Sequence, residues 1–413
     1  MGRSFGFLLS STALSNLADG VLKVGAPLLA VSMTRSPTLV SLAGAAATVP
    51  WLLLALHAGA IADRLDRRRI MVVANVARAA VLSLAGLAAL LGLLDLWVLL
   101  AAVLLAGVAE VFADTSAQSI LPMTVPQNHL TRANGRVSTA QMIGNDFVGA
   151  PLAGLLVVTL PAVVFGAPAL LYGAAGLLLL GMRGTYRMDV PRAQGRPLRR
   201  DIGEALRYLW SHRVLRSLAV TAGLLNLANA AYFAVFVLWA VGDGSRIGLE
   251  PGEYGLMTTA FAVGALPGSL LSGWAAGRFG EFRALVGCWL MTSLLLIVPV
   301  VVPSPWTLYP TAVLWGVAGA AGNVLVISAR QRLIPAGLLG RVNSAYRLVG
   351  MGGMPLGAAL GGVVAEFAGL GAVLVGATGV CLGGVGLVWR ALSDRISRPL
   401  TSAPALSDIS GSR

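Results

Sequence analysis

The chain has 413 residues, of which 57% are hydrophobic and only 11% are charged. A soluble protein of this length would form about two or three domains and carry about 25% charged residues. The composition therefore excludes a soluble protein and predicts a membrane protein with many spans. The net charge of +13 does not indicate nucleic acid as a partner, because the arginines separate apolar runs and do not line one face of a domain.

Twelve apolar runs are long enough to cross the bilayer, for which a helix needs about 20 residues. They lie near residues 5–32, 39–62, 70–93, 97–121, 135–160, 162–182, 214–241, 252–276, 284–302, 307–329, 343–368 and 371–391. We predict an all-α membrane protein with two six-helix halves, residues 1–182 and 214–391. The linker, residues 183–213, contains Ile202, Leu206 and Leu209 at helical spacing, which predicts an amphipathic helix on the membrane surface. Residues 392–413 predict a disordered tail.

The arginines predict the orientation of the spans. If the chain starts inside, the inner loops receive nearly all of the arginines, and the outer loops receive only Arg35 and Arg246. Lys23 is the only lysine, a bias that suggests a GC-rich bacterial genome. We therefore expect a multi-pass protein of the bacterial cytoplasmic membrane, with both termini in the cytoplasm.

Two loop sequences occur once in each half, at matching places. The segment VPQNHLTRANG after the fourth span recurs as IPAGLLGRVNS after the tenth span, 209 residues later. The segment GAIADRLDRRR after the second span recurs as GWAAGRFGEFR after the eighth span, 214 residues later. Duplicated halves are typical of secondary transporters, in which the substrate site lies between the halves.

The segment GAIADRLDRRR resembles the loop signature of the major facilitator superfamily. The stretch SILPMTVPQNHLTRANG is similar to twelve-helix exporters that include macrolide-efflux and enterobactin-exporter-like proteins. This resemblance extends over nearly the whole chain. It implies the major facilitator fold, transport by alternating access and a proton gradient as the energy source, and it leaves the substrate open.

The resemblance also implies a conformational latch at the inner end of the second span. Its members in this sequence are Gly59, Asp63, Arg64, Arg67, Arg68 and Asp114. Gly59 would let the second and eleventh spans approach, Asp63 would face the start of the eleventh span, and Asp114 would pair with the basic loop. Asp66 stands where the family usually has glycine, and Gly277 replaces the acidic residue in the second copy, so we expect a one-sided latch. A basic loop that only sets the topology is the alternative.

The fifth span carries Gly149, Pro151 and Gly154, which resemble the glycine-proline motif that antiporters have between their halves. The match is degenerate, because Ala150 separates Gly149 from Pro151. A bendable helix that favours export and ordinary packing of small residues both explain this pattern.

Ionisable side chains inside spans are the candidates for coupling or substrate binding, because a charge at the bilayer centre costs about 2.5–3.5 kcal/mol. Asp19 and Lys23 lie four residues apart on one face of the first span. They form either a self-sufficient ion pair or a proton-binding carboxylate with a cationic neighbour. Glu110 in the fourth span and Asp146 in the fifth are further candidates, and Glu366 is expected at an interface.

Polar side chains in the second half either line a cavity or bond between helices. They are Asn226, Asn229, Tyr232 and Asn323.

The predicted function is secondary active transport. No zinc-binding or phosphate-binding pattern occurs, so we expect no enzyme, no metal and no cofactor. The interpretation that follows is proton-coupled export of an amphiphilic small molecule, such as a drug, a macrolide-like compound, a siderophore or a secreted metabolite, by a monomer. The alternatives are an importer or lipid-moving transporter of the same fold, and a membrane receptor that does not transport.

Overall fold

A computed structural model describes residues 2–126, 129–187, 198–334 and 339–396. Its helices are α1 (Arg3–Met33), α2 (Pro37–Arg64), α3 (Arg67–Leu90), α4 (Leu96–Thr124), α5 (Leu130–Met142), the π-helical segment η2 (Ile143–Gly149), α6 (Ala150–Thr159), α7 (Pro161–Leu180), α8 (Leu198–Ser211), α9 (Arg213–Ala240), α10 (Pro251–Phe279), α11 (Glu281–Leu295), α12 (Val298–Val301), α13 (Pro305–Leu333), α14 (Leu339–Met351), α15 (Gly353–Ala368) and α16 (Leu370–Ile396).

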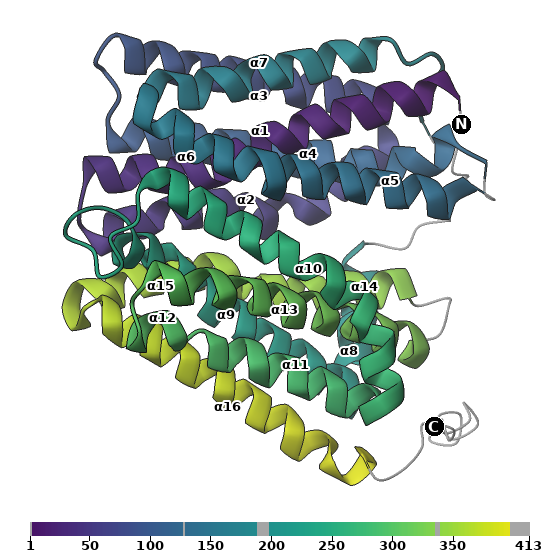
Figure 1. The fold of residues 1–413 in the computed structure, drawn as a ribbon. Coiled ribbons are helices and arrows are strands. Elements are labelled where there is room, and N and C mark those ends of the chain that lie inside the picture. Colours follow the sequence, from purple (N-terminus) through teal and green to yellow (C-terminus); the bar gives the residue numbers. More distant parts are fainter. Residues whose placement is uncertain (1, 127–128, 188–197, 335–338, 397–413) are drawn as a thin grey trace.

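Within these described ranges, twelve helical stretches are long and apolar enough to cross a membrane, which confirms the predicted all-α class. Three of these stretches are composite, because α5, η2 and α6 form the fifth, α11 and α12 the ninth, and α14 and α15 the eleventh. Figure 1 shows α1 to α7 on one side of the molecule and α9 to α16 on the other. α1 begins and α16 ends at the same end of the bundle, which we call the termini end; the opposite end is the far end.

Polar side chains fix the starts of several helices. Ser36, Asp66 and Asp95 accept hydrogen bonds from the backbone N–H groups of the first turns of α2, α3 and α4. Glu250 and Glu253 form a capping box at the start of α10. These caps allow sharp turns between long spans.

The two halves meet along α2 with α15 and along α6 with α10. Small residues allow this close approach, because a Cβ on Gly154 would lie 2.4 Å from the Pro251 carbonyl oxygen and a Cβ on Gly255 would lie 2.5 Å from that of Ala150. These contacts lie at the start of α10, the end of that helix that faces away from the termini end (Figure 1).

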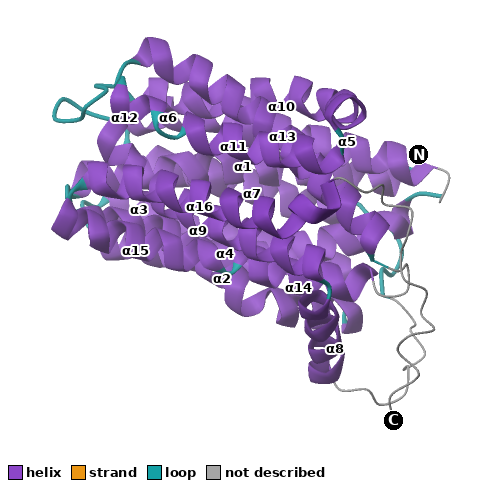
Figure 2. Ribbon diagram, turned by 90° about the horizontal axis from the view of Figure 1, so that it is seen from below, coloured by secondary structure: helices purple, strands orange, loops and turns teal. Residues whose placement is uncertain are grey.

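The amphipathic helix of the linker is present as α8, which packs against α14 and runs across the bundle, as Figure 2 shows. Ala205 and Leu209 are buried, and the Tyr208 hydroxyl donates to the Leu333 carbonyl oxygen at 3.4 Å. Part of the apolar face therefore meets protein, and the position of α8 on the membrane surface stays a prediction. The side chain of Ile202 lies outside the described side chains.

The last helix is longer than expected, because α16 continues to Ile396 through part of the predicted tail. Residues 397–413 lie outside the described residues.

A buried ionic cluster as the candidate functional site

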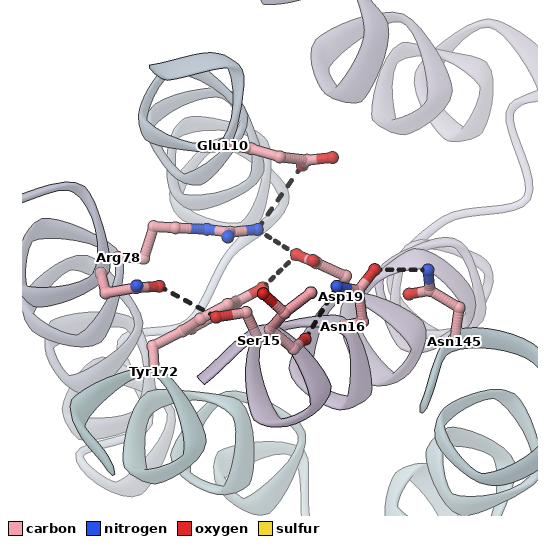
Figure 3. Close-up of polar contacts among 9 residues, drawn as sticks. Ser15, Asn16, Asp19, Arg78, Glu110, Asn145 and Tyr172 are labelled. Carbon is pink, nitrogen blue, oxygen red and sulfur yellow. Dashed lines mark hydrogen bonds and ion pairs between the residues drawn. The ribbon is translucent and has the colours of Figure 1, made fainter. Parts of the chain in front are cut away.

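Arg78 of α3 lies at the centre of a cluster of charged side chains inside the first half (Figure 3). Its guanidinium forms an ion pair with Asp19 of α1, and the exposed fractions of the two side chains are 1% and 15%. The same nitrogen, Nη2, lies 3.6 Å from a carboxylate oxygen of Glu110 of α4. Arg78 thus bridges two acidic side chains from two different helices.

Tyr172 of α7 completes the cluster around Arg78. Its hydroxyl donates to the Asp19 carboxylate at 2.6 Å, and its ring lies 3.9 Å from the Arg78 guanidinium. Burial of an arginine in a membrane requires such partners, since a lone charge there is costly. Four spans, α1, α3, α4 and α7, therefore meet at one polar point.

Asp114 lies on α4 one turn after Glu110, and its charge interacts with those of Asp19 and Arg78. The sequence-based expectation was a pairing of Asp114 with the basic loop. Because Glu110 and Asp114 share a helical face, Asp114 lies on the side of α4 that carries the ionic cluster, and its pairing with the basic loop stays a prediction. Trp51 of α2 lies within hydrogen-bonding reach of the Glu110 carboxylate.

Asp19 does not pair with Lys23, although the two residues are four apart. Asp19 faces α3 and α7, whereas Lys23 is exposed and its charge acts on Asp146. Arg78 and Tyr172 are not among the site residues predicted from the sequence. The available signal was a lone arginine inside the third predicted span, which needs an acidic partner.

The basic loop residues Arg67 and Arg68 contact groups within the first half. Arg68 donates to the carbonyl oxygens of Leu179 and Leu180 at 2.8 and 2.7 Å, so it caps the C-terminal end of α7. Arg67 donates to the Tyr186 carbonyl oxygen at 3.4 Å. Their observed bonds hold α3 against α7.

Asp66, the departure from the family pattern, has two bonds in this loop. Its carboxylate accepts from the backbone N–H of Arg69 at 3.1 Å and from that of Tyr186 at 3.0 Å. An N-cap carboxylate needs no glycine-like flexibility, which explains its presence at this position.

Gly59 has no close neighbour among the described residues in this conformation, and its place in the latch stays a prediction. A Cβ on Gly59 would meet no heavy atom within 4 Å, whereas a Cβ on Gly362 of α15 would lie 1.8 Å from the Ser41 hydroxyl of α2. α2 and α15 therefore pack closely at Ser41 and Gly362, and a Cβ on Gly352, the residue before α15, would lie 3.3 Å from the Leu52 side chain of α2. Arg64 is exposed, and the side chain of Asp63 lies outside the described side chains.

The π-helical segment η2 places Asp146 where α1, η2 and α10 meet. A Cβ on Gly149 would lie 2.8 Å from the Cα of Gly20, so η2 packs directly on α1. The Asp146 carbonyl oxygen accepts from the Thr259 hydroxyl of α10 at 2.8 Å. Single π-helical turns are frequent at functional sites.

Pro151 follows in the first turn of α6, one turn before Gly154. The three motif residues thus lie along the contacts with α1 and α10.

Two of the four polar candidates of the second half form hydrogen bonds to neighbouring helices. Asn226 donates to the Gly350 carbonyl oxygen at 2.9 Å, and the Tyr232 hydroxyl donates to that of Leu296 at 2.9 Å. Asn323 is exposed, and the buried side-chain oxygen of Asn229 has no hydrogen-bond partner among the described residues. Asn229 and Asn323 are therefore the two that remain available for a ligand.

Aromatic side chains contact one another next to these residues. The ring centroids of Phe233, Phe261 and Trp315, from α9, α10 and α13, lie 5.1 to 6.0 Å apart. Within the described part of the chain, no group of three or more His, Cys, Asp or Glu residues is arranged to hold a metal ion.

Comparison with known proteins gives relatives at low identity over most of the chain. Multidrug resistance protein MdtG of Dickeya zeae is 27% identical, with 83% of this chain and 82% of the relative covered. Multidrug efflux pump Tap of Mycolicibacterium fortuitum is 25% identical, with 88% and 89% covered. Enterobactin exporter EntS of Citrobacter koseri is 27% identical, with 91% and 87% covered.

Solved structures share the fold. A bacterial homologue of the iron transporter ferroportin, in an inward-facing state, has a TM-score of 0.73 at 16% identity, covering 95% of this chain and 99% of that one. The nucleoside transporter NupG has a TM-score of 0.72 at 13% identity, covering 95% and 99%. The family model described as transmembrane secretion effector matches residues 2–399. The chain therefore belongs to the transmembrane secretion effector family of the major facilitator superfamily and is a membrane transporter, not an enzyme.

Proposed function

We propose that this transporter exports an amphiphilic small molecule in exchange for protons, and that the cluster around Arg78 is its coupling site. The observation that carries the proposal is the imbalance of charge in this cluster. Three carboxylates, those of Asp19, Glu110 and Asp114, surround one arginine within a membrane-spanning bundle. Excess negative charge is unfavourable away from water, and binding of a proton or of a cationic group relieves it.

The geometry supports different roles for Asp19 and Glu110. Asp19 has both the ion pair to Arg78 and the Tyr172 hydrogen bond, so two charge-assisted contacts already hold its carboxylate. Glu110 lies 3.6 Å from Arg78, and 32% of its side chain is exposed. We infer that Glu110 carries the exchanging proton and that its ionised form competes with Asp19 for Arg78. A shift of Arg78 between two carboxylates would move α3 relative to α1 and α4.

The conformation supports access from the termini end. The halves pack closely where Gly154 meets Pro251 and where Gly362 meets Ser41, whereas a Cβ on Gly59, Gly273 or Gly277 meets no heavy atom of the described residues within 4 Å. If the arginine distribution sets the orientation, the termini end is cytoplasmic and this conformation faces inward. An exporter loads its substrate in that state.

An amphiphilic substrate fits the different character of the two halves. The first half carries Lys23, Glu110 and Asp146, whereas the second half carries the clustered rings of Phe233, Phe261 and Trp315. The relatives named for multidrug efflux and for enterobactin export are consistent with such a substrate. Lys23 and Asp146 would then contact polar groups of the substrate.

The test is transport by purified protein in liposomes with an imposed pH gradient. We expect accumulation of a cationic drug, a macrolide or a catecholate siderophore to follow the gradient, and Glu110→Gln to abolish the coupled flux. A matched control is Asp243→Asn, which removes an exposed acid from the loop between α9 and α10. Flux that ignores the gradient, or equal flux in both variants, would contradict the proposal; accumulation in the import direction would select the importer.

A further inference from the structure

A groove lies between α3 and α4, next to the segment that follows α7. It has a volume of about 760 Å³. Its position is separate from the ionic cluster. Ala77 and Ala109 line the groove, and each directly precedes a cluster residue, Arg78 or Glu110. Successive residues of a helix point about 100° apart, so the groove and the cluster lie on different faces of the same two helices.

The body of the groove is apolar. Ile70, Val73 and Ala77 of α3 line one wall, and Ala109 and Phe112 of α4 line the other. The exposed fraction of Val73 is 68%. α3 packs against α4 and α7 of its own half, away from α9 to α16 (Figure 1). Such a face of a membrane-spanning helix lies against acyl chains.

The mouth of the groove is basic. Arg69 and Arg187 line it, and both are exposed. Asp66 also lines it, but its two carboxylate oxygens accept the N–H groups of Arg69 and Tyr186. Arg69 lies in the first turn of α3, where the span begins and the headgroups of a bilayer would lie.

We propose that this groove is a binding site for an anionic phospholipid. The headgroup phosphate would lie between Arg69 and Arg187, because guanidinium groups match the geometry of phosphate oxygens. One acyl chain would lie along Val73 and Phe112. The charge at the mouth distinguishes this site from the general contact of spans with lipid, since a zwitterionic headgroup would gain less there. The site does not depend on which substrate is transported or in which direction.

The internal repeat provides a matched control for the test. Arg283 of α11 occupies the position of Arg69 in the second copy, 214 residues later, and it is also exposed. Loss of phosphatidylglycerol binding in Arg69→Ala but not in Arg283→Ala would separate a specific site from surface charge. Ala77→Trp keeps both arginines and fills the groove, so it tests the apolar part separately.

The experiment is native mass spectrometry of the full chain, delipidated in detergent and titrated with phosphatidylglycerol or phosphatidylcholine. We expect one preferred phosphatidylglycerol, weakened about fivefold by Arg69→Ala, the effect of one cation near an anionic headgroup. Ala77→Trp should weaken it at least as much, and Arg283→Ala should leave it unchanged. Equal binding of the two lipids, or equal losses in Arg69→Ala and Arg283→Ala, would overturn the proposal. A transported drug that Ala77→Trp excludes while phosphatidylglycerol still binds would also overturn it.

Discussion

The carboxylate of Glu366, at the end of α15, accepts a hydrogen bond of 2.7 Å from the hydroxyl of Ser36, just before α2. The same oxygen lies 3.3 Å from the backbone nitrogen of Thr38 in the first turn of α2. An acid of the second half thus caps a helix of the first half at the far end. Sequence reasoning expected only an interfacial position for Glu366, and the structure identifies its partner.

Removal of this cap should weaken closure at the far end. In Glu366→Ala, the N–H groups at the start of α2 lose an acceptor from the other half, so the open form of the far end should gain population. Spin labels in the loop before α2 and the loop after α15 would report a larger share of long distances. Asp95→Asn, which weakens a cap at the same end within the first half, should leave this distribution unchanged.

The ion pair of Arg78 predicts a large effect on stability. Arg78→Gln should lower the free energy of unfolding by about 3–5 kcal/mol, because it leaves carboxylates buried without a cation. The double variant Asp19→Asn, Arg78→Gln should be more stable than Arg78→Gln alone. Thermal unfolding in detergent measures both. Additive losses in the double variant would mean that the two side chains do not interact.

Two tyrosines allow a comparison of hydrogen bonds to charged and neutral acceptors. Tyr172→Phe removes a bond to the Asp19 carboxylate, and Tyr232→Phe removes a bond to the Leu296 carbonyl oxygen. We expect losses of about 1.5–3 kcal/mol and about 0.5–1.5 kcal/mol in unfolding free energy, respectively. A loss for Tyr232→Phe that is equal or larger, measured under the same conditions, would contradict the stronger hydrogen bond that we expect between Tyr172 and Asp19.

Gly59 tests whether the family latch forms in another conformation. A methyl group at Gly59 would meet no heavy atom of the described residues within 4 Å, so Gly59→Ala should fold without loss of stability. If α2 approaches the eleventh span at Gly59 when the far end opens, Gly59→Ala should slow transport although it folds normally. Gly273→Ala, at the matching position of the second copy, is the control. Equal transport rates in the two variants would remove Gly59 from the latch.

The spans were predictable because each one is a local signal of about 20 apolar residues between arginines and turn residues. The ionic cluster was predictable only in part. The acids Asp19, Glu110 and Asp114 stand out in apolar surroundings, but their common partner Arg78 is 59 residues from Asp19 in the chain. Which face of α3 meets α1 depends on packing among several helices, and the spacing of charges along one helix does not contain that information. For the same reason, the sequence indicates Lys23, the nearest cation along the chain, as the partner of Asp19, whereas the partner in the structure is Arg78.

The ionic cluster lies within one half of a duplicated molecule. The repeat kept the loops and the helices, but among the described residues of α9, α10, α13 and α15 the charged side chains lie in the first or last turn. The spans that contain α1, α3, α4 and η2 instead carry six charged side chains farther inside, those of Asp19, Lys23, Arg78, Glu110, Asp114 and Asp146. In the proposed function, the first half couples transport to protons and the second half contacts the apolar part of the substrate. The two properties can then evolve independently. Substitutions among the rings of Phe233, Phe261 and Trp315 would then change what is carried while the proton chemistry stays intact, which is a physical route by which one scaffold diversifies into exporters of unrelated compounds.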